Sequence, residues 1–221
     1  MNCRHCNRIL KFCLLDLGFA PPSNNYITKD GLNRSEAYYP LRILICDSCF
    51  LAQTQDFNKP EELFSKDYAY LSSVSKSWLE HSKKFVHNAI RKFSLTPENF
   101  VIEIGSNDGY LLKNFIVENI PCIGIEPTSI AATLARQKGI VVVEDFFTAN
   151  LADYIIKEYR RADLVIINNV LAHVPNLHDF VTAVYKILKS DGVVTIEVPH
   201  ILNLLKQAQF DTIYHEHYSY F

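Results

Sequence analysis

Residues 100–109 read FVIEIGSNDG, a short apolar run that ends in a polar turn containing two glycines. Four further apolar runs follow, at 122–125, 140–143, 164–167 and 193–198, with amphipathic stretches between them. Short buried strands that alternate with helices are typical of a doubly wound parallel sheet. We therefore predict an α/β fold with a Rossmann-like core in residues 99–221.

Polar residues follow the predicted strands, at the positions that face a bound ligand in sheets of this kind. They are Glu103 to Gly109, Glu126 and Pro127, Glu144 to Phe147, Asn168 to His173, and Pro199 with His200. A dinucleotide fingerprint would require glycine at 107 and 110, where the chain has Asn107 and Tyr110. Glu126 follows Gly105 by about twenty positions, the spacing of a carboxylate that binds ribose hydroxyls. The pattern predicts a nucleoside ligand without a pyrophosphate.

Two Cys-x2-Cys pairs stand near the amino terminus, Cys3 with Cys6 and Cys46 with Cys49. This spacing lets two thiolates from one tight turn bind one tetrahedral ion, and four thiolates favour zinc. The segment between the pairs has too little apolar surface to fold unaided, so the metal would stabilise it. We predict a structural zinc site in a domain of residues 1–66, with free or redox-active thiols as the alternative. Cys13 is expected to be a small buried hydrophobic residue.

The segment of residues 67–98 is predicted to be a helical linker or lid. Apolar residues recur at helical spacing between Val74 and Phe93, with lysines and histidines on the opposite face. His81 and His87 fall on that solvated face, so we assign them no function.

Composition excludes several classes of function. The 221 residues carry a net charge of -2 and 48% hydrophobic residues, without the basic excess of a nucleic-acid-binding protein. Neither a signal peptide nor an apolar run of about 18 residues is present, so we expect no membrane partner and a cytoplasmic location. That compartment keeps thiols reduced, which favours metal binding over disulfides.

The strand-end motifs resemble those of class I S-adenosylmethionine-dependent methyltransferases. The resemblance implies that Glu126 binds the cofactor's ribose, that Asp145 and Phe146 contact its adenine, and that Gly105 and its neighbours face the methionine portion. The complete set of implied cofactor contacts is Glu103, Gly105, Asn107, Gly109, Glu126, Pro127, Asp145, Phe146 and Asn168.

The chain as a whole resembles the sugar C-methyltransferases, which methylate carbon 3 of a nucleotide-linked 4-keto deoxysugar. Four stretches carry the resemblance: the four cysteines, DYAYLSS (67–73), EIGSNDG (103–109) and YHEHYSYF (214–221). The implied partner is a nucleotide sugar, with dTDP as the expected nucleotide. Removing a proton next to a ketone needs a base and hydrogen-bond donors for the enolate oxygen, tasks that suit histidine and tyrosine.

The resemblance also implies roles for individual residues of this chain. His217 would be the general base, with Glu216 orienting or polarising it. Tyr214 would stabilise the enolate or position the sugar, and Tyr68, or else Tyr70, would supply a second hydroxyl. His173 is a competing base.

Other interpretations stay open. His173, His215 and His217 could bind a metal, although they lack the i, i+4 spacing of helical zinc hydrolases, or they could form an ordinary polar cluster. The chain could also be an O-methyltransferase of a sugar or small molecule, or a non-catalytic cofactor-binding module with structural zinc.

The end of the sequence gives a further expectation. Family members continue into a second domain after YHEHYSYF, and the fold normally adds two strands after the fifth. Without them, residues 193–198 would form a hydrophobic sheet edge, which proteins usually cover or charge. We therefore expect a core truncated after strand 5, a fragment of a longer protein or a chain that pairs with another copy, and we leave monomer or dimer open.

Overall fold

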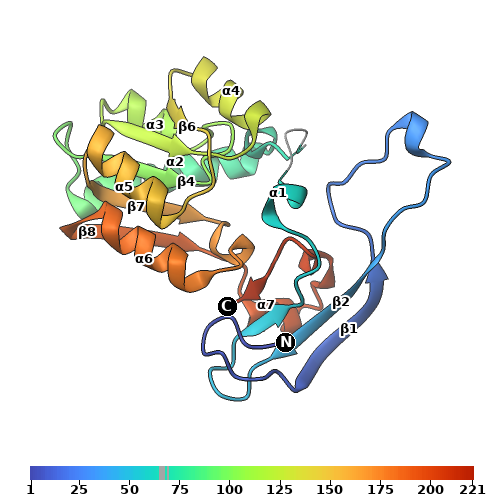
Figure 1. Cartoon of the computed structure of the whole chain (residues 1–221). Coiled ribbons are helices and arrows are strands. Elements are labelled where there is room, and N and C mark those ends of the chain that lie inside the picture. Colours follow the sequence, from blue (N-terminus) through green and yellow to red (C-terminus); the bar gives the residue numbers. More distant parts are fainter. Residues whose placement is uncertain (65–67, 69) are drawn as a thin grey trace. The chain divides into compact units, whose positions relative to one another are not determined.

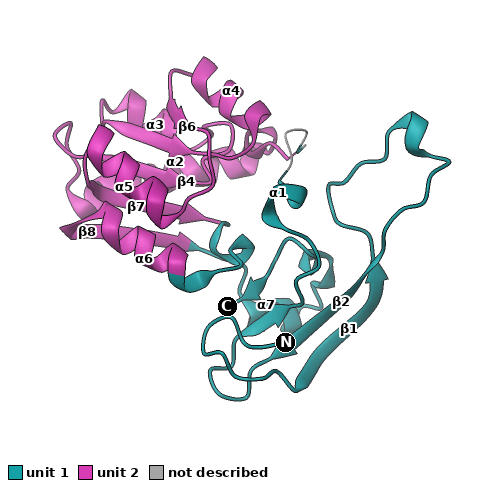
Figure 2. Cartoon of the chain, in the orientation of Figure 1, with its two compact units in different colours: residues 1–68, 169–178, 197–221 teal, residues 69–168, 179–196 magenta. Residues whose placement is uncertain are grey.

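The computed structural model describes residues 1–64, 68 and 70–221 (Figure 1). The chain divides into two compact units (Figure 2). Unit 1 contains Met1–Tyr68, Asn169–His178 and Glu197–Phe221, and unit 2 contains Ala69–Asn168 and Asp179–Ile196. The predicted domains 1–66, 67–98 and 99–221 stay a prediction. Asp67, at the start of the DYAYLSS stretch, lies outside the described residues.

Unit 2 is built on a five-stranded sheet in the order β6-β5-β4-β7-β8. The strands are β4 (Val101–Ile104), β5 (Cys122–Ile125), β6 (Val141–Val143), β7 (Ala162–Asn168) and β8 (Leu188–Glu197). β4 pairs in parallel with both β5 and β7, and β5 pairs in parallel with β6. Because the chain runs outward from β4 to β6 and then returns to β7, the order of strands reverses at β4, where such folds bind ligands. The predicted α/β fold class is confirmed.

Among the described residues, one helix directly precedes these strands and four connect them. They are α2 (Lys76–Phe93), α3 (Leu112–Val117), α4 (Ser129–Gln137), α5 (Ala149–Glu158) and α6 (Leu177–Ile187). α2 begins where Ser75 Oγ accepts a hydrogen bond from the backbone of Trp78, and it ends at Ser94 in the left-handed conformation. Its apolar face, including Val86 and Ala89, packs in one buried cluster with Phe115 and the central strands. The predicted helical stripe is therefore a core contact.

Unit 1 contains a second sheet, in which the end of the chain joins the amino-terminal strands. Its order is β1 (Phe12–Ala20), β2 (Tyr39–Ile45), β3 (Ala52–Thr54) and β9 (Ser219–Tyr220), all antiparallel. β9 pairs Tyr220 with Ala52 and Ser219 with Gln53. Buried Leu41, Ile43, Leu204 and Tyr220 belong to the core of this unit. The final octapeptide therefore contributes a two-residue strand, Ser219–Tyr220, to the sheet of unit 1.

The remaining elements of unit 1 are short. They are α1 (Pro60–Leu63), α7 (Ile201–Lys206) and 3-10 helices at Lys29–Gly31, Leu171–His173 and Phe210–Thr212, while Ser72–Val74 forms one in unit 2. The prediction that Cys13 is buried is wrong, because it lies exposed on β1, most of whose residues face solvent. Within the described ranges, none of the helices has the length and apolar character needed to cross a bilayer.

Candidate active site and metal centre

Four cysteine side chains converge in unit 1. The Sγ atoms of Cys3, Cys6, Cys46 and Cys49 all lie within 4.8 Å of one another. The sulfur atoms of Cys3 and Cys49 are 3.6 Å apart, and those of Cys6 and Cys46 are 3.4 Å apart. A tetrahedral zinc ion with Zn–S bonds of about 2.3 Å places its sulfur ligands about 3.8 Å from one another. The group fits zinc, as the spacing predicts.

The two turns that carry the cysteines, here called knuckle 1 (residues 3–8) and knuckle 2 (residues 46–51), have the same local geometry. The first cysteine of each donates its N–H to the carbonyl five residues later, Arg8 for Cys3 and Leu51 for Cys46. One residue of each, Asn7 or Phe50, has a positive φ, which makes the turn tight. Each turn therefore holds two sulfur atoms on one side of its backbone.

Hydrogen bonds to sulfur favour the thiolate form that a metal requires. Burial alone would raise the pKa of Cys3, but hydrogen bonds from the Cys6 backbone and the Gln53 side chain lower it to about 6. Backbone N–H groups of Cys49 and Ser48 lower the pKa of Cys46. Burial raises the pKa of Cys49 to about 12, and the neighbouring thiols of Cys3 and Cys46 act in the same direction.

The first set of predicted cofactor residues lies in the turn after β4. Gly105 and Gly109 both have positive φ values, 68° and 75°. Asn107 is buried and donates its side-chain amide to the carbonyl of Tyr70, while its amide oxygen accepts the backbone N–H of Ser72. A segment ahead of α2 is thus fixed to this turn.

Glu126 connects the turns after β4 and β5. One carboxylate oxygen accepts the backbone N–H of Asn107 at 2.9 Å, and the other accepts the N–H and the hydroxyl of Thr128 at 2.9 and 2.5 Å. Burial raises the pKa of Glu126 despite these hydrogen bonds. Burial also raises the pKa of Glu103 well above its usual value, and the nearby Tyr110 hydroxyl offsets only part of the effect.

The other predicted cofactor residues follow neighbouring strands at the same edge of the sheet. Pro127 is half-buried after β5, Asp145 is exposed and Phe146 half-buried after β6, and Asn168 is buried at the end of β7. Within the described residues, the buried side-chain oxygens of Ser106 and Asn168 and one carboxylate oxygen of Asp108 have no hydrogen-bond partner. Such orphaned oxygens indicate a polar ligand. The residues present fit a nucleoside cofactor that carries an amino acid portion.

The predicted catalytic residues come together in unit 1 as a separate group, here called the histidine–tyrosine cluster: Tyr68, His173, Tyr214, Glu216 and His217. The rings of His173 and His217 have centroids 4.6 Å apart. His217 Nδ1 lies 3.0 Å from the carbonyl oxygen of Thr212, and its Nε2 lies 3.1 Å from the Tyr214 hydroxyl. Because a carbonyl only accepts, Nδ1 carries the proton and Nε2 presents a lone pair.

The carboxylate of Glu216 is directed to other partners than the imidazole. It is fully buried and accepts hydrogen bonds from Ser23 Oγ at 2.6 Å, Asn24 Nδ2 at 2.9 Å and the Tyr68 hydroxyl at 3.0 Å. Its backbone carbonyl accepts the Nδ1 proton of His173 at 2.9 Å. The Nδ1 atom of His217 contacts the Thr212 carbonyl and its Nε2 contacts the Tyr214 hydroxyl, so neither of these contacts of the ring involves the Glu216 carboxylate.

Burial keeps both imidazoles neutral. It lowers the pKa of His217 to about 4, and burial together with the neighbouring His217 lowers the pKa of His173 to about 3. Both rings therefore have an available lone pair throughout the neutral range. Among the described residues, the four cysteines are the group whose geometry could hold a metal, and the three histidines form no such group.

Several polar residues at these sites were not predicted. Ser23 and Asn24 lie in a proline-containing loop without periodicity, and their contact with Glu216 joins residues 193 and 192 positions apart. Thr128 follows Glu126 by two positions, a spacing at which a hydroxyl can reach back to a carboxylate, so this signal was present in the sequence.

Comparison with known families assigns the chain to a class. Residues 78–221 match the family described as "Methyltransferase domain", and residues 3–64 match the family described as "Putative zinc binding domain". The chain belongs to the methyltransferase domain family.

Individual proteins are similar to this chain. The chain is 32% identical over 220 residues to the C-methyltransferase NovU of Streptomyces niveus, in a match that covers 100% of this chain and 52% of that protein. It thus spans about half the length of the curated relative it matches. A solved S-adenosylmethionine-dependent methyltransferase from Archaeoglobus fulgidus has the same fold, with a TM-score of 0.51, 22% identity, and coverage of 63% of this chain and 61% of that one.

Proposed function

We propose that the protein containing this chain transfers a methyl group from S-adenosylmethionine to carbon 3 of a nucleotide-linked 4-keto deoxysugar, the nucleotide being dTDP. The similarity to a C-methyltransferase supports carbon as the acceptor atom. The histidine–tyrosine cluster supports the same reaction, because enolisation requires a base beside hydroxyl donors. The observation that carries the proposal is the lone pair of His217 Nε2 beside the Tyr214 hydroxyl.

His217 is the general base in this proposal. The Nδ1–H bond to Thr212 holds the ring with Nε2 as the acceptor. Nε2 removes the proton from carbon 3, and the electron pair of that C–H bond moves into the enolate. Because burial lowers the pKa of His217 to about 4, the ring is neutral at pH 6 to 8.

Tyrosine hydroxyls receive the negative charge that develops on the ketone oxygen. The Tyr214 hydroxyl lies 3.1 Å from His217 Nε2. When the substrate separates these two groups, the hydroxyl would donate to the ketone oxygen instead. Tyr68 is fixed by its hydrogen bond to Glu216, which gives that carboxylate a positioning role. His173, whose Nδ1 is bonded to the Glu216 carbonyl, packs beside His217 and is assigned a supporting role.

The cofactor would be held at the carboxyl edge of the sheet in unit 2. Glu126 and Asp145 would bind the ribose and adenine, with Pro127 and Phe146 alongside, and Glu103, Gly105, Asn107, Gly109 and Asn168 would surround the methionine portion. When bound, S-adenosylmethionine supplies an electrophilic methyl group for the enolate carbon. The proton held on His217 then returns to solvent.

The test separates proton removal from methyl transfer. The protein is incubated in D2O with a dTDP-4-keto-deoxysugar and S-adenosylhomocysteine, and deuterium at carbon 3 is followed by mass spectrometry. We expect exchange in the wild type and a loss of about 10²- to 10⁴-fold in H217N. With S-adenosylmethionine, the product should gain one methyl group on carbon.

Two comparisons make the test decisive. H87N changes an exposed histidine to which no function is assigned and is expected to exchange as the wild type does. Rapid exchange in H217N together with loss in H173N would assign the base to His173 and overturn our choice. Methylation of an oxygen, without any exchange at carbon 3, would overturn the carbon chemistry.

A further inference from the structure

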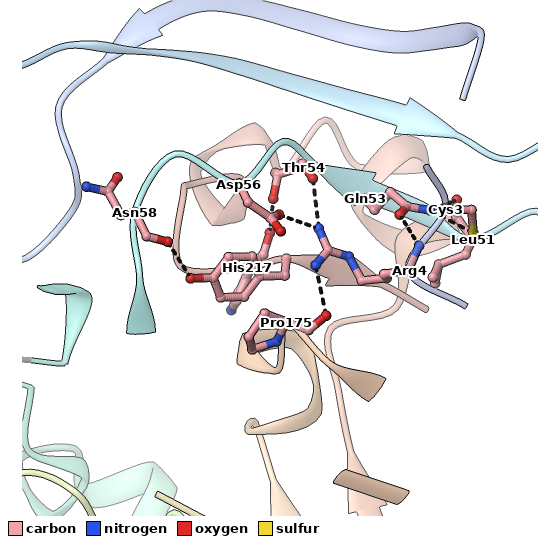
Figure 3. A network of polar contacts seen from close by, with 10 residues as sticks. Cys3, Arg4, Leu51, Gln53, Thr54, Asp56, Asn58, Pro175 and His217 are labelled. Carbon is pink, nitrogen blue, oxygen red and sulfur yellow. Dashed lines mark hydrogen bonds and ion pairs between the residues drawn. The ribbon is translucent and has the colours of Figure 1, made fainter. Parts of the chain in front are cut away.

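We propose that Arg4 is a positioning residue that links the zinc site to the histidine–tyrosine cluster. Arg4 lies in knuckle 1, between Cys3 and Cys6, and only 5% of its side-chain surface is exposed. A buried guanidinium is stable only where several acceptors surround it. The positions of those acceptors show what the side chain holds together (Figure 3).

Three segments of unit 1 supply the acceptors. Arg4 donates to the carbonyl oxygen of Thr54 at 3.0 Å and to the carbonyl oxygen of Pro175 at 3.2 Å. It also forms an ion pair of 2.7 Å with Asp56. Its guanidinium carbon lies 5.3 Å from the centre of the Tyr218 ring, over its face. One side chain therefore contacts β3, the loop after His173 and the final octapeptide.

Thr54 continues the connection to His217. Its hydroxyl donates to the backbone carbonyl of His217 at 2.8 Å, and its N–H donates to the carbonyl of Tyr218 at 3.2 Å. Arg4 fixes the carbonyl of this same residue. A single residue, Thr54, therefore connects the Arg4 guanidinium to the backbone of His217, the proposed base.

Pro175 connects Arg4 to the second imidazole. It lies two positions after His173, in a segment whose Ala172 carbonyl accepts the N–H of Tyr218 at 2.7 Å. Arg4 thus holds the two chain segments from which His173 and His217 project. The separation of the two rings depends on both segments staying in place.

The metal side of the connection is equally direct. The backbone N–H of Arg4 donates to Gln53 Oε1 at 3.0 Å, and Gln53 Nε2 donates to Cys3 Sγ at 3.3 Å. Gln53 is fully buried on β3, in register with Ser219 on β9. A metal held by Cys3 and Cys6 would fix the backbone on both sides of Arg4. Zinc bound there would thereby set the geometry of the histidine–tyrosine cluster through this side chain.

The inference rests on the proposed function only for the consequence on turnover, so the primary test needs no substrate. Hydrogen–deuterium exchange of peptides covering 169–178 and 214–221 is compared in the wild type, R4M and R8M, with zinc content measured on the same samples. R8M is the matched control, because Arg8 is an exposed arginine of the same knuckle. We expect R4M to keep its zinc and to exchange at least about tenfold faster in both peptides, with R8M unchanged.

A kinetic test distinguishes positioning from general stability. In R4M we expect kcat to fall about 10- to 100-fold, because small displacements of catalytic groups slow a reaction strongly, while the affinity for S-adenosylhomocysteine changes less than about twofold. R4K keeps the charge but not the planar fork, so it should restore little of the lost rate. If the wild-type protein neither methylates a keto sugar nor exchanges its carbon-3 proton, the proposed function fails. The amide hydrogen–deuterium exchange of the protein still decides the role of Arg4.

Two results would overturn the inference. One is an R4M protein that holds zinc and shows wild-type exchange in both peptides. The other is wild-type exchange of residues 214–221 in T54V, a variant that removes only the hydroxyl that donates to the His217 carbonyl and leaves the knuckles intact. If R4M loses its zinc, T54V decides: faster exchange in 214–221 supports the connection, and wild-type exchange refutes it.

Discussion

The two units of the chain are organised by different kinds of interaction. In unit 2, a buried central strand pairs in parallel with its neighbours, and apolar side chains of the helices pack against them. In unit 1, the decisive contacts are polar or metal-directed and join distant parts of the sequence, as when Arg4 contacts Pro175, 171 positions later. Unit 2 is therefore stabilised mainly by apolar contacts, whereas unit 1 adds a few specific polar contacts to a smaller apolar core.

This difference separates the two halves of the proposed chemistry. The residues proposed for cofactor binding belong to unit 2, and the histidine–tyrosine cluster belongs to unit 1. Substitutions should therefore divide into those that abolish proton removal while cofactor binding survives, and those that do the reverse.

The largest expected effect comes from removing one zinc ligand. In C46S, zinc affinity should be lost, and because metal-binding energy contributes to folding, unit 1 should lose on the order of 5 kcal/mol of stability. Exchange at carbon 3 should disappear, while calorimetric titration with S-adenosylhomocysteine should give an affinity within about threefold of the wild type. C13S is the control, since Cys13 is exposed and lies outside the four-cysteine group. Cofactor affinity that fell together with zinc would contradict the proposed separation of cofactor binding from proton removal.

The converse separation is expected from E126Q. The amide places a donor where a carboxylate oxygen now accepts the N–H of Asn107, and it removes the charge proposed to bind the ribose. Loss of a charged hydrogen bond costs about 2 to 3 kcal/mol, so affinity for S-adenosylhomocysteine should fall roughly a hundredfold. Zinc content and the exchange of residues 214–221 should not change. E158Q, on the exposed surface of α5, is the control, and wild-type affinity in E126Q would remove Glu126 from the cofactor site.

The same difference explains what the sequence could predict. The five strands of unit 2 and the four-cysteine group were predicted because each depends on local signals, apolar periodicity or the spacing of two cysteines. The gathering of His173, Tyr214 and His217 was implied only by family resemblance. No local pattern indicates that Ser23 and Asn24 bond to Glu216, or that Ser219 and Tyr220 form a strand beside β3. Such contacts depend on how distant segments fold together, which periodicity does not encode.

A smaller effect, confined to unit 2, is expected at Gly109. A Cβ atom there would clash with the Ile140 side chain and lie 3.2 Å from Ala135 Cβ, in a backbone with φ +75°. G109A should lose about 2 kcal/mol in the free energy of unfolding, measured as a lower urea midpoint. Gly139 is the matched control: it has a similar φ of +82° but no atom within 4 Å of the added methyl group, so G139A should lose only about 1 kcal/mol. Equal losses would show that backbone conformation alone, without packing, constrains Gly109.

The smallest effect concerns the pH dependence of unit 1. The pKa of His217 falls from 6.5 to about 4 on folding and that of His173 from 6.5 to about 3, so the unfolded chain binds more protons than the folded chain between these values. The contribution of these two histidines to the free energy of unfolding is therefore fully present above pH 6.5 and is lost as the pH falls toward 4. The loss is about 1 kcal/mol for each histidine between pH 6.5 and 5.5. Glu103 acts in the opposite direction, since its pKa is raised by burial, but it is common to every variant compared. The urea midpoint of H173N should accordingly fall less steeply with acid than those of the wild type and H200N, which changes an exposed histidine of unit 1. A slope unchanged in H173N would mean that water reaches this imidazole in the folded protein, and the neutral pair of rings on which the proposed base depends would not exist.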